Sequence, residues 1–194
     1  MIDTNKESEF VKIRINLAAL QQKFHPCTLD FIRDTCQARC CRSTVDPSGI
    51  AVVVRPQEII PLEALGAKID HETGRIEAVN RRCPFQREDN HCCSLHGTPE
   101  KPAGCIISPF TVNKNNSLIV RNRYRMFPCF KAEGAIPVYL AHRGSLERLF
   151  GAKATEYLCE RASVPGTQEV IHLLARASLV EALVHKNANS KQSK

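Results

Sequence analysis

A cysteine-rich segment in the middle of the chain constrains the fold more than any other part. From Cys83 to Cys105 the sequence holds four cysteines, three prolines, two glycines and two histidines. Prolines and glycines at this density interrupt both long helices and long strands. The conformation of this segment must therefore be fixed by something other than a backbone hydrogen-bond ladder, and its four sulfurs indicate a metal ion or a metal cluster.

A second group of cysteines lies upstream, at Cys36, Cys40 and Cys41. We expect both groups to close on one inorganic centre. The first nine residues are polar and show no apolar targeting segment, and no apolar run approaches the roughly 20 residues of a membrane span. We therefore expect a cytoplasmic protein without a membrane partner, and thiols in the cytosol stay reduced. Clustered cysteines then favour metal ligands or catalytic groups over disulfides.

Length and composition indicate one domain of mixed structure. The chain has 194 residues, of which 43% are hydrophobic, so it can bury a substantial core. Strand-like and helix-like segments both occur, which predicts an α+β fold with a small irregular cysteine-rich core, short antiparallel strands and C-terminal helices. We expect a metal-binding part over residues 1–133, a helical part over 134–185 packed on it, and a disordered tail over 186–194.

Local patterns predict the individual elements. Alternating apolar and charged residues predict a strand over 10–15, after which Asn16 caps a helix over 17–24. The run from Val170 to Val184, preceded by Thr167 and Glu169, has the clearest helical pattern of the chain. The other predicted elements are strands over 50–54, 69, 75–79, 106–112 and 117–124, with helices over 56–65 and 152–162.

The basic character of the chain has two interpretations. Its formal charge of +7 counts every cysteine as neutral, and this charge falls if four or more thiols bind metal as thiolates. The positive charge then partly balances an anionic centre. Alternatively, Arg121, Arg123 and Arg125 alternate on one strand face and bind an anionic partner such as a phosphate backbone, unless that face is simply solvated.

The cysteine spacing predicts a metal without choosing it. A zinc site holds four ligands around the ion, with sulfur at about 2.3 Å, and short-range pairs such as Cys36 with Cys40 let one loop supply two of them. The spacing differs from the C-x₂-C pair of a zinc ribbon. Spacing alone therefore leaves both zinc and an iron–sulfur cluster open.

Five separated elements resemble a known family. They are Cys36-x₃-Cys40-Cys41, Cys83-Pro-Phe-Gln, Cys93-Ser-Leu-His, Lys101-Pro-Ala-Gly-Cys105 and Ser108-Pro-Phe110. In this order they resemble the YkgJ-type cysteine-cluster family, written CxxCxxCC and described as zinc- or iron-chelating, and the resemblance covers about residues 27–130. Flagellin lysine methylases carry a similar cysteine set.

The resemblance implies a metal centre and its ligands. Carried over by position, the ligands are Cys36, Cys40, Cys41, Cys83, Cys93 and Cys105, with Cys129 matching a last, less regular cysteine. The implied cofactor is a [4Fe–4S] cluster or zinc. We favour the iron–sulfur cluster, because six or seven thiolates exceed the four that one zinc ion takes; two zinc ions, or one cluster with additional reactive thiols, would also account for the excess.

The remaining candidate residues leave the cellular role open. We expect Cys93 rather than its neighbour Cys92 to be a ligand, and Cys159 to be a core residue. Cys27, His91 and His96 could be ligands or simply neighbours of the site. The sequence shows no Gly-rich phosphate loop, no H-E-x-x-H and no G-x-S-x-G. The hypotheses are a metal-binding protein, a cluster-dependent modifying enzyme of methyltransferase type, and a nucleic-acid- or protein-binding module with structural zinc.

Overall fold

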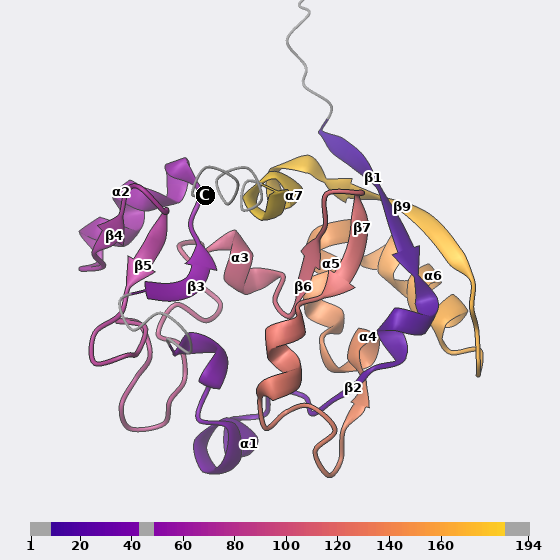
Figure 1. Ribbon diagram of the computed structural model, residues 1–194, viewed down its shortest axis with the longest axis horizontal. Helices are drawn as coiled ribbons and strands as arrows, with labels where there is room; N and C mark the ends of the chain where they lie inside the picture. The colour runs from indigo at the N-terminus through magenta and orange to yellow at the C-terminus, as the bar shows by residue number, and fades with distance from the viewer. Residues whose placement is uncertain (1–8, 43–48, 185–194) are drawn as a thin grey trace, which may run out of the picture. The chain divides into compact units, whose positions relative to one another are not determined.

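The computed structural model describes residues 9–42 and 49–184 and confirms the α+β class (Figure 1). The described part holds nine strands: β1 Phe10–Asn16, β2 Lys23–Phe24, β3 Gly49–Val53, β4 Ile69–Asp70, β5 Arg75–Glu77, β6 Phe110–Val112, β7 Ser117–Val120, β8 Ile136–Pro137 and β9 Val170–Arg176. It also holds seven α-helices: α1 Leu29–Phe31, α2 Pro56–Ala64, α3 Ala103–Ile106, α4 Val138–Ala141, α5 Arg143–Phe150, α6 Ala152–Ala162 and α7 Ala177–Val184. Shorter turns are the 3₁₀ helices Leu17–Gln21, Arg39–Cys41 and Asn122–Met126 and the π-helix Ile32–Cys36.

Contacts divide the chain into two units made of interleaved segments. Unit 1 comprises residues 1–22, 107–121 and 137–194, and unit 2 comprises residues 23–106 and 122–136. The division expected from the sequence, with a metal-binding part over 1–133 and a helical part over 134–185, stays a prediction about folding units. The predicted tail over 186–194 lies outside the described residues.

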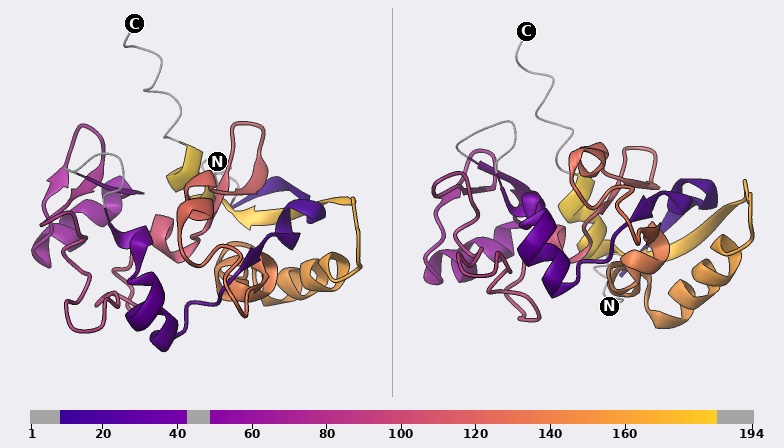
Figure 2. Two further views of the ribbon diagram at one scale, coloured as in Figure 1. Left: turned by 60° about the horizontal axis from the view of Figure 1, so that its bottom comes forward. Right: turned by 90° about the horizontal axis from the view of Figure 1, so that it is seen from below.

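Unit 1 is built on a four-stranded sheet in the order β6-β7-β1-β9. β1 pairs with β9 antiparallel over its whole length, from Phe10 opposite Arg176 to Asn16 opposite Val170, and with β7 in parallel. The two strands run alongside each other in both views of Figure 2. Ile13 and Ile15 are fully buried on one face, while the residues that alternate with them are exposed. The apolar core of unit 1 therefore lies against the face of β1 that carries Ile13 and Ile15.

The helix predicted over residues 167–184 is wrong in its first half. Residues 170–176 form strand β9, and the helix α7 begins only at Ala177. Ile171 and Ala175 are buried and the residues between them alternate in exposure, so the run also satisfies the period of a strand. Pairing with the distant strand β1 decides the outcome, because β1 would otherwise be an unpaired edge.

Most of the other predicted elements are confirmed. The side chain of Asn16 caps the turn Leu17–Gln21 by accepting a hydrogen bond from the amide of Ala18 over 3.0 Å, although this helix is shorter than predicted. β1, β3, β6, α2, α6 and the β4–β5 hairpin lie within a few residues of their predicted positions. No helix in the described part of the chain combines the length and the apolar character of a membrane span.

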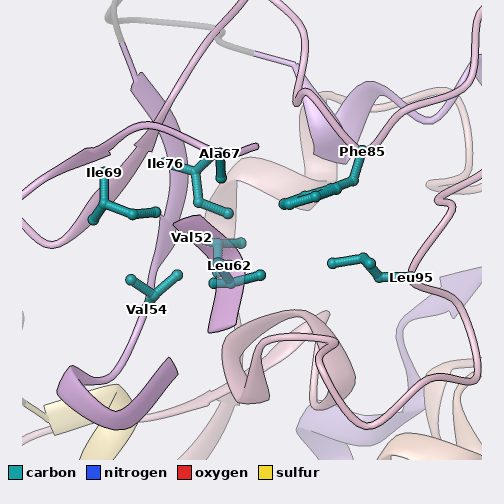
Figure 3. Packing of buried hydrophobic residues seen from close by; sticks show 8 residues of the cluster. All are labelled: Val52, Val54, Leu62, Ala67, Ile69, Ile76, Phe85 and Leu95. Atoms are coloured by element: carbon teal, nitrogen blue, oxygen red, sulfur yellow. The ribbon is translucent and has the colours of Figure 1, made fainter. Parts of the chain in front are cut away.

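The apolar core of unit 2 supports the cysteine-rich segment. It consists of eight buried residues: Val52, Val54, Leu62, Ala67, Ile69, Ile76, Phe85 and Leu95. Phe85 and Leu95 come from the cysteine-rich segment itself and point toward Val52 and Leu62 (Figure 3). Cys83, Cys93 and Cys105 pack against this cluster while remaining half-buried. Hydrophobic packing, rather than a strand ladder, thus fixes the backbone on which three sulfurs lie.

A buried carboxylate holds the short helix that carries Cys105. The Glu58 side chain of α2 is 9% exposed, and it accepts a hydrogen bond from the amide of Ala103 over 2.8 Å. Arg55 completes the arrangement with a 2.6 Å ion pair to the same carboxylate. The helix also approaches β3 closely, since a Cβ placed on Gly104 would lie 3.0 Å from Val52 Cγ1.

Replacing Glu58 by alanine should therefore destabilise unit 2. The substitution leaves the amide of Ala103 and the guanidinium of Arg55 without their buried acceptor, which costs about 2–3 kcal/mol. Urea unfolding of the two proteins measures the difference. Glu63→Ala on the same helix is the matched control, because Glu63 forms only an exposed pair with His71, a kind of contact that contributes little. Equal losses in both variants would contradict the positioning role of Glu58.

Candidate metal centre

Nine of the ten cysteines lie in unit 2, including all seven predicted ligands. The remaining one, Cys159, is 8% exposed in α6 of unit 1 and is a core residue as expected. All ten are free thiols. Both predicted cysteine groups therefore lie in unit 2.

The first cysteine loop depends on an irregular helix end. After α1 the chain forms a π-helical turn that ends at Cys36, and Gln37 and Ala38 then adopt left-handed conformations with φ of 49° and 45°. Residues other than glycine rarely adopt this conformation, which costs on the order of 1–2 kcal/mol each. The turn leads directly into Arg39–Cys41, where the Sγ atoms of Cys40 and Cys41 lie 3.9 Å apart. Sulfurs bound to one tetrahedral zinc at about 2.3 Å would be spaced by about 3.8 Å.

Hydrogen bonds join the second cysteine loop to the first. The amide of Cys83 donates to the carbonyl of Cys41 over 2.9 Å, and the side-chain amide of Gln86 donates to the carbonyl of Gln37 over 2.9 Å. Gln86 also forms an antiparallel bridge with Cys93. Because Gln86 is 6% exposed, its contacts fix the second loop against the first from the inside.

Five thiols interact electrostatically with one another. Burial raises the pKa of Cys83 to about 11, with further contributions from Cys93 and Cys40. Burial likewise raises the pKa of Cys105 to about 12, and Cys83, Cys93 and Cys40 add to it. The pKa of Cys41 is raised first by its hydrogen bond with Cys40 and by burial, then by the charges of Cys40, Cys105 and Cys83. We call this set the central thiol group: Cys40, Cys41, Cys83, Cys93 and Cys105.

Cys36 and Cys129 form a separate pair beside this group. Their thiols share a hydrogen bond, which lowers the pKa of Cys36 to about 6 and raises that of Cys129. The amide of His25 donates to the carbonyl of Cys129 over 2.8 Å and so holds this part of the chain in place. Cys40 acts on Cys129 as well as on Cys83 and Cys105. It is therefore the thiol that links the pair to the central group, while Cys27 acts on Cys129 from the exposed side.

Cys92 and the two nearby histidines lie at the edge of the site. The thiol of Cys92 faces the carbonyl of Asn90 at 3.6 Å, whereas Cys93 is the member of the adjacent pair that acts on Cys83 and Cys105. His96 is exposed and its Nδ1 lies 3.1 Å from Lys101 Nζ, and the charge of that lysine lowers the pKa of His96. His91 has a buried Nδ1 with no hydrogen-bond partner among the described residues.

The predicted arginine face is wrong. Strand β7 ends at Val120, and residues 122–126 form a 3₁₀ turn, so Arg121, Arg123 and Arg125 do not alternate along a strand. Arg125 is exposed, but the Nε and Nη2 atoms of Arg123 are buried. The pKa of Cys40 is lowered mainly by its hydrogen bond with Cys41. The charge of Arg123 lowers it further. The sequence pattern could not predict the burial of Arg123, because it depends on the turn that follows Val120.

The donor set suits a sulfur-ligated centre, although the thiols do not form a finished single-ion site. In residues 9–42 and 49–184 no three histidine, cysteine, aspartate or glutamate groups are positioned to hold a metal ion together. A zinc ion would require four of the sulfurs to draw together to about 2.3 Å from one point. All-thiolate donors suit zinc and iron–sulfur clusters alike. The buried Nε and Nη2 atoms of Arg123 also have no hydrogen-bond partner among the described residues.

The raised thiol pKa values predict that the metal-free protein loses stability in alkali. In the unfolded chain these thiols titrate near 9.0, whereas in the folded chain Cys83 and Cys105 keep their protons to about 11 and about 12. Between these values the folded state binds more protons than the unfolded state, so the free energy of unfolding falls as pH rises. The two thiols make their full contribution to the free energy of unfolding below pH 9. Urea unfolding of metal-free protein at about pH 8 and about pH 10 tests the sign, and greater stability at the higher pH would contradict it.

One family model is similar to the cysteine-containing part of the chain. The family model CxxCxxCC, described as "Putative zinc- or iron-chelating domain", matches residues 33–124. The match spans six of the seven predicted ligands and Arg123, and it leaves out Cys27 and Cys129. No curated protein and no solved structure matches the chain. Residues 33–124 of this chain are therefore similar to the CxxCxxCC family, whose model describes a putative zinc- or iron-chelating domain.

Proposed function

We propose that the chain binds a [4Fe–4S] cluster, with zinc as the alternative metal, through the central thiol group. The observation that carries this proposal is the set of electrostatic interactions that link Cys40, Cys41, Cys83 and Cys105 with one another, and Cys93 with Cys83 and Cys105. Four thiolates hold such a cluster. Cys83, Cys93 and Cys105 are assigned as ligands from the second loop and α3, and Cys40 or Cys41 as the ligand from the first loop.

The spacing of the thiols favours a cluster over a single ion. Within the described parts of the chain no three ligand groups already converge on a point, as a preformed zinc site would require. A cubane cluster separates its four thiolates by its own iron and sulfide atoms, so it accommodates a wider ring of sulfurs. The thiols are more numerous than the four that either a cluster or a zinc ion uses, so we assign Cys36 and Cys129 to positions beside the centre rather than on it.

The residues around the thiols supply charge and exclude water. Burial and the neighbouring thiols raise the pKa of Cys105, and the charge of Lys101 acts in the opposite direction. A cation at this place offsets part of the negative charge that four thiolates bring. The apolar cluster under Cys83, Cys93 and Cys105 shields that side of the centre from solvent, and the surroundings of a cluster in turn set its potential. When bound, a cluster of this kind supplies one-electron redox chemistry.

An absorption spectrum of protein purified without oxygen tests the proposal. We expect a broad visible band from sulfur-to-iron charge transfer that bleaches on reduction with dithionite and decays in air. Cys159→Ser should keep this band, because Cys159 lies in the core of unit 1. A colourless protein that contains zinc would replace the cluster with its alternative, and a colourless protein without iron or zinc would refute the metal proposal altogether.

A further inference from the structure

Arg123 has buried hydrogen-bond donors that lack an acceptor. Its Nε and Nη2 atoms are shielded from solvent and form no hydrogen bond with the described residues. Burying an unpaired donor of a charged group costs more free energy than burying a neutral one, and folded proteins satisfy nearly all buried polar groups. The side chain is therefore arranged for an acceptor that is not one of the described protein groups.

The position of the guanidinium is fixed by aromatic packing. Its central carbon lies 5.2 Å from the ring centroid of Tyr124, a cation–π contact. Tyr124 is 5% exposed and packs edge-on against Phe127 with ring centroids 5.3 Å apart. The amide of Lys131 donates to the carbonyl of Lys23 over 3.0 Å and anchors the end of this segment. The guanidinium is thus supported in its place, and its burial is not the result of a loosely held chain.

Arg123 acts on Cys40, the thiol that links the pair of Cys36 and Cys129 to the central thiol group. The pKa of Cys40 is lowered mainly by its hydrogen bond with Cys41 and to a smaller extent by the charge of Arg123. Cys40 in turn acts on Cys83, Cys105 and Cys129. No carboxylate forms an ion pair with Arg123 in the salt bridges of the described residues. Thiolate or sulfide sulfur is the kind of anionic acceptor that the central thiol group would bring.

We propose that Arg123 is a positioning residue that donates its buried N–H groups to the anionic metal centre on the side of Cys40. This inference rests on the proposed function. A guanidinium at this place stabilises the negative charge of the bound thiolates. If the centre is a cluster, it also favours the more negative reduced state, because hydrogen bonds and charge beside the sulfurs tune the reduction potential.

The role predicts opposite effects of one substitution in two states of the protein. Arg123→Gln removes the unpaired charge from the metal-free protein, so that form should be as stable as the wild type or more stable. In the metal-loaded protein the same substitution removes a hydrogen-bond donor to the centre, so the metal should bind about 10- to 100-fold more weakly. A residue that merely supported the fold would weaken both forms together.

The experiment compares Arg123→Gln and Arg123→Lys with Arg125→Gln, an exposed arginine of the same turn. Metal is withdrawn from protein purified without oxygen by competition with a chelator, and urea unfolding gives the stability of each metal-free protein. For an iron-loaded protein, potentiometry gives the midpoint potential. We expect weaker metal binding and a more negative potential for Arg123→Gln, an intermediate effect for Arg123→Lys, and wild-type behaviour for Arg125→Gln.

The outcomes separate this inference from the proposal on which it rests. A wild-type protein that contains no metal refutes the proposed function and this role with it. A metal-loaded wild type, with Arg123→Gln and Arg125→Gln alike in metal binding, refutes the role of Arg123 alone. Loss of stability in metal-free Arg123→Gln would show that the side chain supports the fold and would equally overturn the assignment.

Discussion

Replacing Cys93 by serine should remove the metal from the protein, whereas replacing the adjacent Cys92 should leave it bound. Cys93 acts on Cys83 and Cys105 within the central thiol group, while the thiol of Cys92 faces the carbonyl of Asn90. Loss of one of four thiolate ligands should reduce the metal content to about a tenth of the wild-type value or less. Elemental analysis of both variants, purified without oxygen, measures this difference.

The adjacent pair makes this a closely matched comparison. Both residues lie in the same loop and both are half-buried, so a general disturbance of the loop would affect the two variants alike. Circular dichroism of each variant confirms that the fold is kept. Equal metal contents in Cys92→Ser and Cys93→Ser would contradict the assignment of Cys93, and loss of metal from Cys92→Ser alone would reverse it.

Removing the metal should speed up amide hydrogen exchange in the cysteine loops of unit 2 and leave exchange in the sheet of unit 1 unchanged. The segment from Cys83 to Cys105 is joined to its surroundings by isolated hydrogen bonds, such as those that the amides of Cys83 and Ala103 donate to Cys41 and Glu58, rather than by a continuous ladder. The binding free energy of a structural metal is largely folding free energy. Amides of this segment should therefore exchange on the order of 100-fold faster, or more, in metal-free protein.

Hydrogen exchange read by mass spectrometry tests this difference between the units. The seven residue pairs of β1 and β9 serve as the internal reference, because their ladder uses no cysteine. Their exchange should change little on metal removal. Uniform acceleration across both strands and the cysteine loops would show that the metal stabilises the whole chain equally, and unchanged exchange in the loops would contradict a structural role for the metal.

The sequence predicted best where a local signal fixes local structure. Asn16 caps the turn that follows it, and the helix over 152–162 has the bounds expected from its apolar spacing. The turn between β6 and β7 follows from Asn113, whose side chain accepts from the amides of Asn115 and Ser117 over 2.9 and 3.0 Å. In each case the residues that decide the structure are close neighbours in the chain.

Prediction failed where a distant partner decides. Residues 170–176 satisfy the spacing of a helix and of a strand, and only pairing with β1 selects the strand. The three arginines read as one strand face until the chain turns after Val120 and buries part of Arg123. Sequence reasoning could group the cysteines, nine of which lie in unit 2. It could not predict the left-handed Gln37 and Ala38 that precede Cys40, because nothing in these residue types signals that conformation.

The amount of iron and zinc per chain, in wild-type protein purified without oxygen, tests the central claim most directly. Sulfurs of the central thiol group should retain about four iron atoms per chain as a [4Fe–4S] cluster. About one zinc ion per chain would keep the metal site and replace the cluster by its alternative. A folded protein that holds neither metal would contradict the account.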